Sequence, residues 1–191
     1  MKLLLLLLAL PMFYFGQNVN IPDANFKAYL VGDTDINTNG DNEIQVSEAS
    51  AFNGWLDVFD ENISNLKGIE AFTALKILNC EDNQLTSLDV SKNTALKTLD
   101  CYGNQLTSLD VSKNTALKTL HCFRNQLTSL DVSKNTALTE LKCGRNQLTS
   151  LDVSKNTALT YLACYDNKFD CAFLLLVHGI TPLPPSSVIE K

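Results

Sequence analysis

Cysteine is the residue type with the most chemical potential in this chain of 191 residues, which contains six of them. Six cysteines in a secreted chain normally indicate disulfides. Here five recur at one constant spacing, and stacked neighbours in such a column have parallel Cβ vectors that suit disulfide geometry poorly. Free cysteine packs as a small buried apolar residue. We therefore predict that one column of thiols fills a core: Cys80, Cys101, Cys122, Cys143 and Cys164.

Other chemistry has little support in the residue types. A disulfide between Cys164 and Cys171 remains open, whereas a metal site lacks the C-x-x-C pair or nearby histidine that would complete four ligands. The only histidines are His121 and His178, and no phosphate-binding loop, catalytic dyad or cofactor fingerprint occurs. The formal net charge of -6 provides no attraction for phosphate backbones. The sequence predicts a protein that is not an enzyme and binds no nucleic acid.

The cysteine spacing belongs to a repeat of 21 residues. Four units read L-x-x-L-x-C-x-x-N-x-L-x-x-L-D-V-S-x-N-T-A and begin at Leu75, Leu96, Leu117 and Leu138, and a fifth unit, which begins at Leu159, keeps the first half of the pattern. A single unit cannot bury its own apolar residues, so neighbouring coils must cover them in a solenoid. The alternation Leu-x-Cys has the period of a strand. We predict a parallel sheet, with strands roughly 4.8 Å apart, from residues 78–80, 99–101, 120–122, 141–143 and 162–164.

An asparagine follows each cysteine at the same short interval. Stacked coils would align these amides in a column at the turn that leaves the strand. An amide there can bond backbone groups of adjoining coils, which satisfies polar atoms that the turn would bury. The predicted column contains Asn83, Asn104, Asn125, Asn146 and Asn167.

The repeat resembles the leucine-rich repeat family over residues 75–169, and most closely its short-repeat secreted bacterial branch. In that branch the second half of the unit, L-x-x-L-D-V-S-x-N, echoes the first. The resemblance implies an α/β-type solenoid: a leucine-rich repeat arc with a short parallel sheet on its concave face and a helical N-terminal cap. It also implies binding of proteins or glycans on that concave face.

Residues 17–54 precede the repeats and differ from them in composition. Phe26, Tyr29 and Leu30 would share one helical face behind Asp23, which predicts a short amphipathic helix over residues 24–31. This helix, an acidic turn and a divergent first repeat over residues 55–74 resemble the helical cap of internalins. Such a cap covers the apolar end of the first coil.

The acidic turn, residues 37–48, resembles an EF-hand calcium loop with Ile44 at the eighth place and Glu48 at the twelfth. Asn37 and Asn42 depart from the Asp and Gly of that family. Few charged ligands would limit the affinity to roughly 10⁻⁴ to 10⁻³ M. The alternative is a metal-free acidic turn. Calcium is the one cofactor that the sequence suggests, and the resemblance implies these ligands: Asn37, Asn39, Asp41, Glu43 and Glu48.

The two ends of the chain differ from the repeats. One positive residue and a short run of leucines predict a secretory signal that ends near Gly16 and is too short to span a bilayer. After Asn167 the repeat breaks down, and a short helix begun at Asp170 or a final buried strand would close the solenoid.

The resulting segments are a signal peptide over 1–16, an EF-hand-like helical cap over 17–54, the divergent repeat over 55–74, the 21-residue repeats over 75–170, and a C-terminal cap with a loose tail over 171–191.

Variation within the repeat indicates where a partner would bind. Unit positions 3, 5, 7 and 8 differ from coil to coil, whereas residues 9 to 21 of each unit hardly change. Alternation about the inward Leu and Cys places the variable side chains on the concave strand face. Exposed positions can also drift without function, but the exposed Lys and Ser columns have not drifted. Aromatic residues and Arg are common interface anchors, and the predicted ligand-binding residues are Asp100, Tyr102, His121, Phe123, Arg124, Lys142, Arg145, Tyr161 and Tyr165.

These patterns together predict a non-catalytic, exported leucine-rich repeat protein, secreted or held at the cell surface. Its concave face would mediate protein–protein interaction or adhesion, and the chain would be monomeric. One alternative is a carbohydrate-binding surface protein in which Tyr102, Phe123 and Tyr165 stack on sugar rings. The other is a structural envelope solenoid without a specific ligand.

Overall fold

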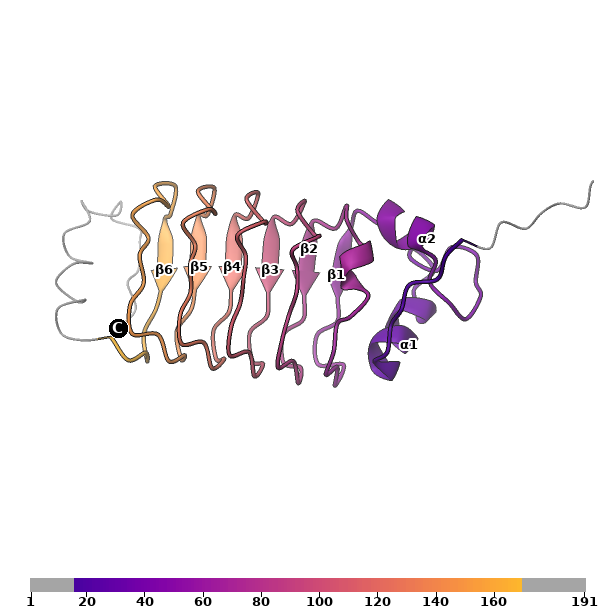
Figure 1. Ribbon diagram of the computed structural model, residues 1–191, viewed down its shortest axis with the longest axis horizontal. Helices are drawn as coiled ribbons and strands as arrows, with labels where there is room; N and C mark the ends of the chain where they lie inside the picture. Colours follow the sequence, from indigo (N-terminus) through magenta and orange to yellow (C-terminus); the bar gives the residue numbers. More distant parts are fainter. Residues whose placement is uncertain (1–15, 170–191) are drawn as a thin grey trace, which may run out of the picture.

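The computed structural model describes residues 16–169, which form a solenoid with one parallel sheet along one side (Figure 1). The six strands follow one another in sequence order, and their central leucines pair in register from Leu56 through Leu162. Neighbouring coils thus cover each other's apolar residues, as the repeat predicted. The strands are β1 (Trp55–Asp57), β2 (Ile77–Asn79), β3 (Thr98–Asp100), β4 (Thr119–His121), β5 (Glu140–Lys142) and β6 (Tyr161–Ala163).

Each repeat strand begins and ends one residue earlier than predicted. The central leucine points into the core, and the residues on either side of it point outward, with partial exposure at most of these positions. The cysteine after each strand still bonds to the next coil: the Cys80 amide N lies 2.8 Å from the Asp100 carbonyl O. The predicted parallel sheet is confirmed, and only its boundaries change.

The cysteine column fills the core, as predicted. Cys80, Cys101, Cys122 and Cys143 are fully buried, and Cys164 at the last described coil is half-buried. All five are free. Burial raises the pKa of these thiols, so they stay protonated and apolar at neutral pH. Cys171 lies outside the described residues.

The asparagine column bonds adjoining coils, as predicted. The Asn104 side-chain Nδ2 donates to the Cys80 carbonyl at 2.9 Å and to the Cys101 carbonyl at 3.2 Å, and its Oδ1 accepts from the Leu85 amide at 2.9 Å. A second buried column, which the sequence reasoning did not single out, bonds carbonyls of the preceding coil. Its members are Asn93, Asn114, Asn135 and Asn156.

Two short helices lie at the N-terminal end of the solenoid: α1 (Ala24–Gly32) and α2 (Val46–Ala51). A 3₁₀ helix, η1 (Ile69–Ala71), follows β1 in the first coil. The predicted helix behind Asp23 is confirmed, because the Asp23 Oδ1 accepts from the Asn25 and Phe26 amides. The Asp23 Oδ2 accepts from the Ser64 amide at 2.9 Å and so joins the helix to the first coil. Phe26 and Leu30 complete the core at this end.

The signal segment over residues 1–15 and the C-terminal cap and tail from residue 170 onward lie outside the described residues. The choice between a closing helix and a closing strand therefore stays open. Within residues 16–169, none of the helices is long and apolar enough to cross a membrane.

Candidate functional site

The outward side chains of β1 to β6 and of the turn after each strand form one surface, which we call the strand face. Strand register aligns them in rows that run along the solenoid. The middle row contains Asp57, Asn79, Asp100, His121, Lys142 and Ala163. The row beyond the cysteines contains Phe59, Glu81, Tyr102, Phe123, Gly144 and Tyr165.

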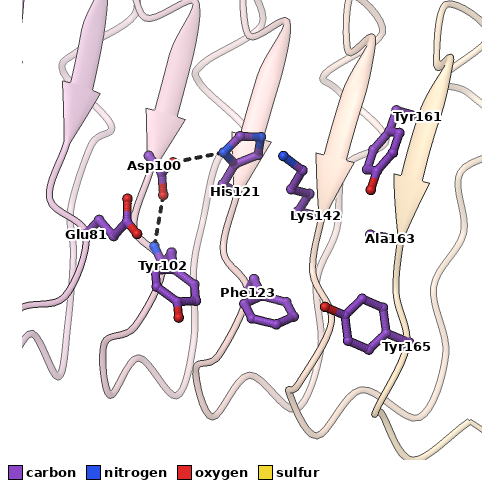
Figure 2. Close-up of a pocket in the computed structure, with 9 residues that line it drawn as sticks. All are labelled: Glu81, Asp100, Tyr102, His121, Phe123, Lys142, Tyr161, Ala163 and Tyr165. Carbon is purple, nitrogen blue, oxygen red and sulfur yellow. Dashed lines mark hydrogen bonds and ion pairs between the residues drawn. The ribbon is translucent and has the colours of Figure 1, made fainter. Parts of the chain in front are cut away.

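A pocket of about 400 Å³ lies on the strand face between these two rows (Figure 2). Seven of the nine predicted ligand-binding residues line it. Arg124 and Arg145 do not, because each is exposed on the turn after its strand, where the backbone has a positive φ. The lining residues are Glu81, Asp100, Tyr102, His121, Phe123, Lys142, Tyr161, Ala163 and Tyr165.

Three rings on one side of the pocket form an aromatic shelf, defined as Tyr102, Phe123 and Tyr165. The centroids of Tyr102 and Phe123 lie 5.3 Å apart at 19°, and those of Phe123 and Tyr165 lie 5.4 Å apart at 60°. Gly144 occupies the row position between the last two rings. A Cβ there would lie 3.1 Å from the Phe123 ring, so the absence of a side chain lets the shelf continue. The Arg145 guanidinium carbon lies 5.5 Å from the Phe123 centroid, within cation–π range.

On the other side the pocket is lined by Asp100, His121 and Lys142, and these residues together with their bonded neighbour Glu140 are called the charged row. The His121 Nδ1 lies 2.8 Å from Asp100 Oδ2, and its Nε2 lies 3.0 Å from Glu140 Oε1. The Lys142 Nζ lies 2.7 Å from the same Glu140 oxygen. Because a carboxylate only accepts, two carboxylate partners require both imidazole nitrogens to carry protons. The arrangement supports a positively charged surface contact rather than a general base.

The pKa values of His121, Glu140 and Lys142 are shifted in the directions that favour charge. Burial alone would lower the pKa of His121, but the hydrogen bond and charge of Asp100, with the hydrogen bond to Glu140, raise it. Burial alone would raise the pKa of Glu140, yet hydrogen bonds from Lys142 and His121 lower it. Glu140 occupies the variable position 3 of its unit but is not among the predicted site residues, because spacing does not reveal its hydrogen bond to His121 on the neighbouring strand.

The charged row predicts a pH-dependent contribution to stability. The folded-state pKa of His121 lies above its usual 6.5, so its stabilisation is complete below that value and is lost as pH rises through the folded pKa. We expect the melting temperature of the wild type to fall from pH 6 to pH 9 by more than that of His121→Gln. Differential scanning calorimetry of both proteins measures this. Equal pH profiles would show that the imidazolium does not stabilise the sheet.

The predicted calcium ligands lie between α1 and α2 and in the first turn of α2, and hydrogen bonds already engage them. The Glu48 Oε1 accepts from the Thr38 amide at 2.9 Å and the Asn39 amide at 3.1 Å, and its Oε2 accepts from the Gln45 amide at 3.0 Å. The Asp41 carboxylate accepts from the side chains of Asn39 and Gln45. A cation would have to replace these bonds at both Asp41 and Glu48. These contacts favour the metal-free alternative.

Calcium titration separates the two alternatives for the cap loop. We expect no binding heat and no rise in melting temperature at millimolar calcium, because the Glu48 carboxylate already satisfies three backbone amides. Isothermal titration and thermal melts, each with Glu48→Gln as the matched variant, provide the measurement. Heat and stabilisation that Glu48→Gln abolishes would establish calcium binding instead.

The strand face also contains two aromatic residues that the sequence reasoning missed. Trp55 in β1 and Phe59 just after it have exposed fractions of 59% and 48%. Trp55 pairs with Ile77, and Ile77 pairs with Thr98, so the first coil is one residue longer than the repeat. Counting back from the outward positions of the second coil, with one extra residue allowed, would have found both.

Comparisons with known proteins agree with this architecture. The family model for Leucine Rich repeats (2 copies) matches residues 94–135. The functional domain of InlJ from Listeria monocytogenes, described as including a cysteine ladder, superposes with a TM-score of 0.72 at 40% identity, over 81% of this chain and 35% of that chain. The internalin inlF from the same organism superposes with a TM-score of 0.71 at 23% identity, over 85% of this chain and 50% of that one. No curated protein is significantly similar.

The protein therefore carries leucine-rich repeats and has the leucine-rich repeat solenoid fold of the internalins. The predicted fold class is confirmed. The chain spans about a third of the InlJ chain and half of the inlF chain. This fold suggests a role in protein interaction.

Proposed function

We propose that this chain is an exported, non-catalytic binding protein whose strand face binds a protein partner at the cell surface. The observation that supports this most strongly is the pocket itself. Residues that vary between otherwise invariant coils converge there, with an aromatic shelf on one side and a charged row on the other. Aromatic residues with adjacent Arg side chains are typical of interface centres.

A pull-down with a matched control tests the proposed function. The bait is the wild type, the Arg124→Ala/Arg145→Ala double variant, or Lys113→Ala/Lys134→Ala, and the prey is a preparation of cell-surface proteins and glycans. Both double variants remove two exposed cations, but the lysines belong to the invariant half of the repeat. We expect the wild type and the lysine variant to retain the same protein and the arginine variant to lose it. Equal retention by all three would contradict the proposal and favour a structural solenoid.

A carbohydrate ligand is the second candidate, because the shelf offers adjacent rings beside hydrogen-bonding groups of the charged row (Figure 2). Treating the prey with protease before the pull-down distinguishes the two. A protein partner is lost after proteolysis, whereas a glycan remains and its retention would depend on Phe123.

A further inference from the structure

Charge divides the strand face into two halves. The outward positions of β1 to β3 and their turns hold Asp57, Asp60, Glu81, Asp82 and Asp100, and no Lys or Arg. Lys76 and Lys97 immediately precede β2 and β3, at the opposite edge of the face from the turn acids. The corresponding positions of β4 to β6 hold three full cations and two acids: Arg124, Lys142 and Arg145 with Glu140 and Asp166.

The acidic half of the strand face also exposes large apolar side chains. Trp55 and Phe59 lie there with exposed fractions of 59% and 48%, and half-buried Ile77 pairs with Trp55. Both aromatic residues belong to or directly follow a strand of the continuous sheet, so their backbone is held in place before any partner arrives. Exposed aromatic side chains on a rigid surface indicate an interaction site.

The carboxylates of this half repel one another. Burial raises the pKa of Glu81, and the charges of Asp100 and Asp82 raise it further, whereas the charge of His121 lowers it and offsets part of this repulsion. Within residues 16–169, no hydrogen bond reaches the Glu81 carboxylate, whereas Asp100 is bonded to His121. Gly103 leaves room for the Asp82 carboxylate, because a Cβ atom at residue 103 would collide with it. The charge of Arg124 already acts on Asp82, so a basic side chain of a partner would relieve the repulsion mainly at Glu81.

We propose that the acidic half of the strand face binds a basic segment of the protein partner in which Lys or Arg residues are interspersed with apolar residues. The basic side chains contact Glu81, Asp82 and Asp57, and the apolar side chains pack on Trp55, Phe59 and Ile77. This assignment rests on the proposed function, since it specifies the chemistry of the partner for one half of the same face. The aromatic shelf and the exposed arginines then contact a different part of the partner.

A peptide titration tests this assignment directly. The probe is a short fluorescein-labelled peptide in which Lys alternates with Leu, and a second peptide of the same length has Glu in place of each Lys. Fluorescence anisotropy at near-physiological salt measures binding to the wild type, Glu81→Gln/Asp82→Asn and Trp55→Ala. The matched control is Asp131→Asn/Asp152→Asn, which removes the same charge from exposed positions of the invariant half.

We expect the Lys peptide to bind and the Glu peptide not to bind. The Glu81/Asp82 and Trp55 variants should each weaken binding about tenfold or more, which corresponds to about 1.4 kcal/mol, and the control variant less than about twofold. Equal weakening by the control would show attraction to net charge alone and would overturn the assignment. So would no binding of the Lys peptide, or equal binding of the Glu peptide.

The pull-down separates this assignment from the proposed function. If the Arg124/Arg145 variant loses the partner and Glu81→Gln/Asp82→Asn retains it fully, the strand face binds a protein but the acidic half does not contribute. That result would overturn the assignment alone. If neither variant affects retention, both proposals fail.

Discussion

Replacing Leu120 with Ala is expected to lower the free energy of unfolding by about 2 to 5 kcal/mol, the usual cost of emptying a buried leucine site. Leu120 is fully buried in β4 and pairs with Leu99 on one side and Leu141 on the other. The cavity would lie where three coils meet. Because solenoid stability depends on contacts between neighbouring repeats, this loss affects the coils on both sides.

Urea unfolding of the wild type, Leu120→Ala and Lys113→Ala measures the effect. Lys113 is exposed in the invariant half of the repeat, so its replacement should change stability by less than about 0.5 kcal/mol. Equal losses for both variants would mean that the inward and outward positions are wrongly assigned.

Asn125→Ala is expected to cost about 2 kcal/mol or more, although the side chain is polar. The buried Leu106 amide would lose its acceptor, and two buried carbonyls would each lose one of their two asparagine donors. Its Nδ2 donates to the Cys101 carbonyl at 2.9 Å and the Cys122 carbonyl at 3.2 Å, and its Oδ1 accepts from the Leu106 amide at 2.9 Å. Alanine replaces none of these bonds. The unpaired Leu106 amide alone costs about 1 to 3 kcal/mol, whereas the Cys101 and Cys122 carbonyls still accept from Asn104 and Asn146.

The Asn125 prediction has two measurements. Urea unfolding should show a large loss for Asn125→Ala and almost none for its exposed neighbour, Gln126→Ala. Hydrogen exchange should show faster exchange of the Leu106 amide in the Asn125 variant only. Unchanged protection of that amide would show that the asparagine does not hold adjoining coils together.

The repeat length alone was enough to predict the solenoid and its core. A 21-residue unit with a strand-like alternation can bury its leucines and cysteines only by stacking, so the sheet, the thiol column and the asparagine column all follow from one spacing. The helix behind Asp23 was predictable for a local reason, because an Asp cap and an apolar face act within one or two turns. The strand boundaries were less predictable, and each repeat strand begins and ends one residue earlier than the alternation indicated.

The candidate site was predictable as a surface but not as a set of contacts. Inward and outward positions followed from alternation, and seven of the nine predicted residues line the pocket. The bonds of His121 to Asp100 and Glu140 join three strands, and they depend on register and side-chain conformation, which a periodic pattern does not contain. Likewise, the role of Gly144 became clear only from the structure, because its lack of a side chain leaves room for the contact between the Phe123 and Tyr165 rings.

Trp55 could have been placed on the strand face from the sequence by allowing for a first coil that is one residue longer than the others. Glu48 shows instead what only the tertiary structure decided. Glu48 has the spacing of a calcium ligand, yet its carboxylate folds back onto three amides of its own loop. Spacing along the chain determined which side chains can point to the same side of a coil. The hydrogen bonds that each polar group finally makes depend on which neighbours the packed coils and cap bring within about 3 Å.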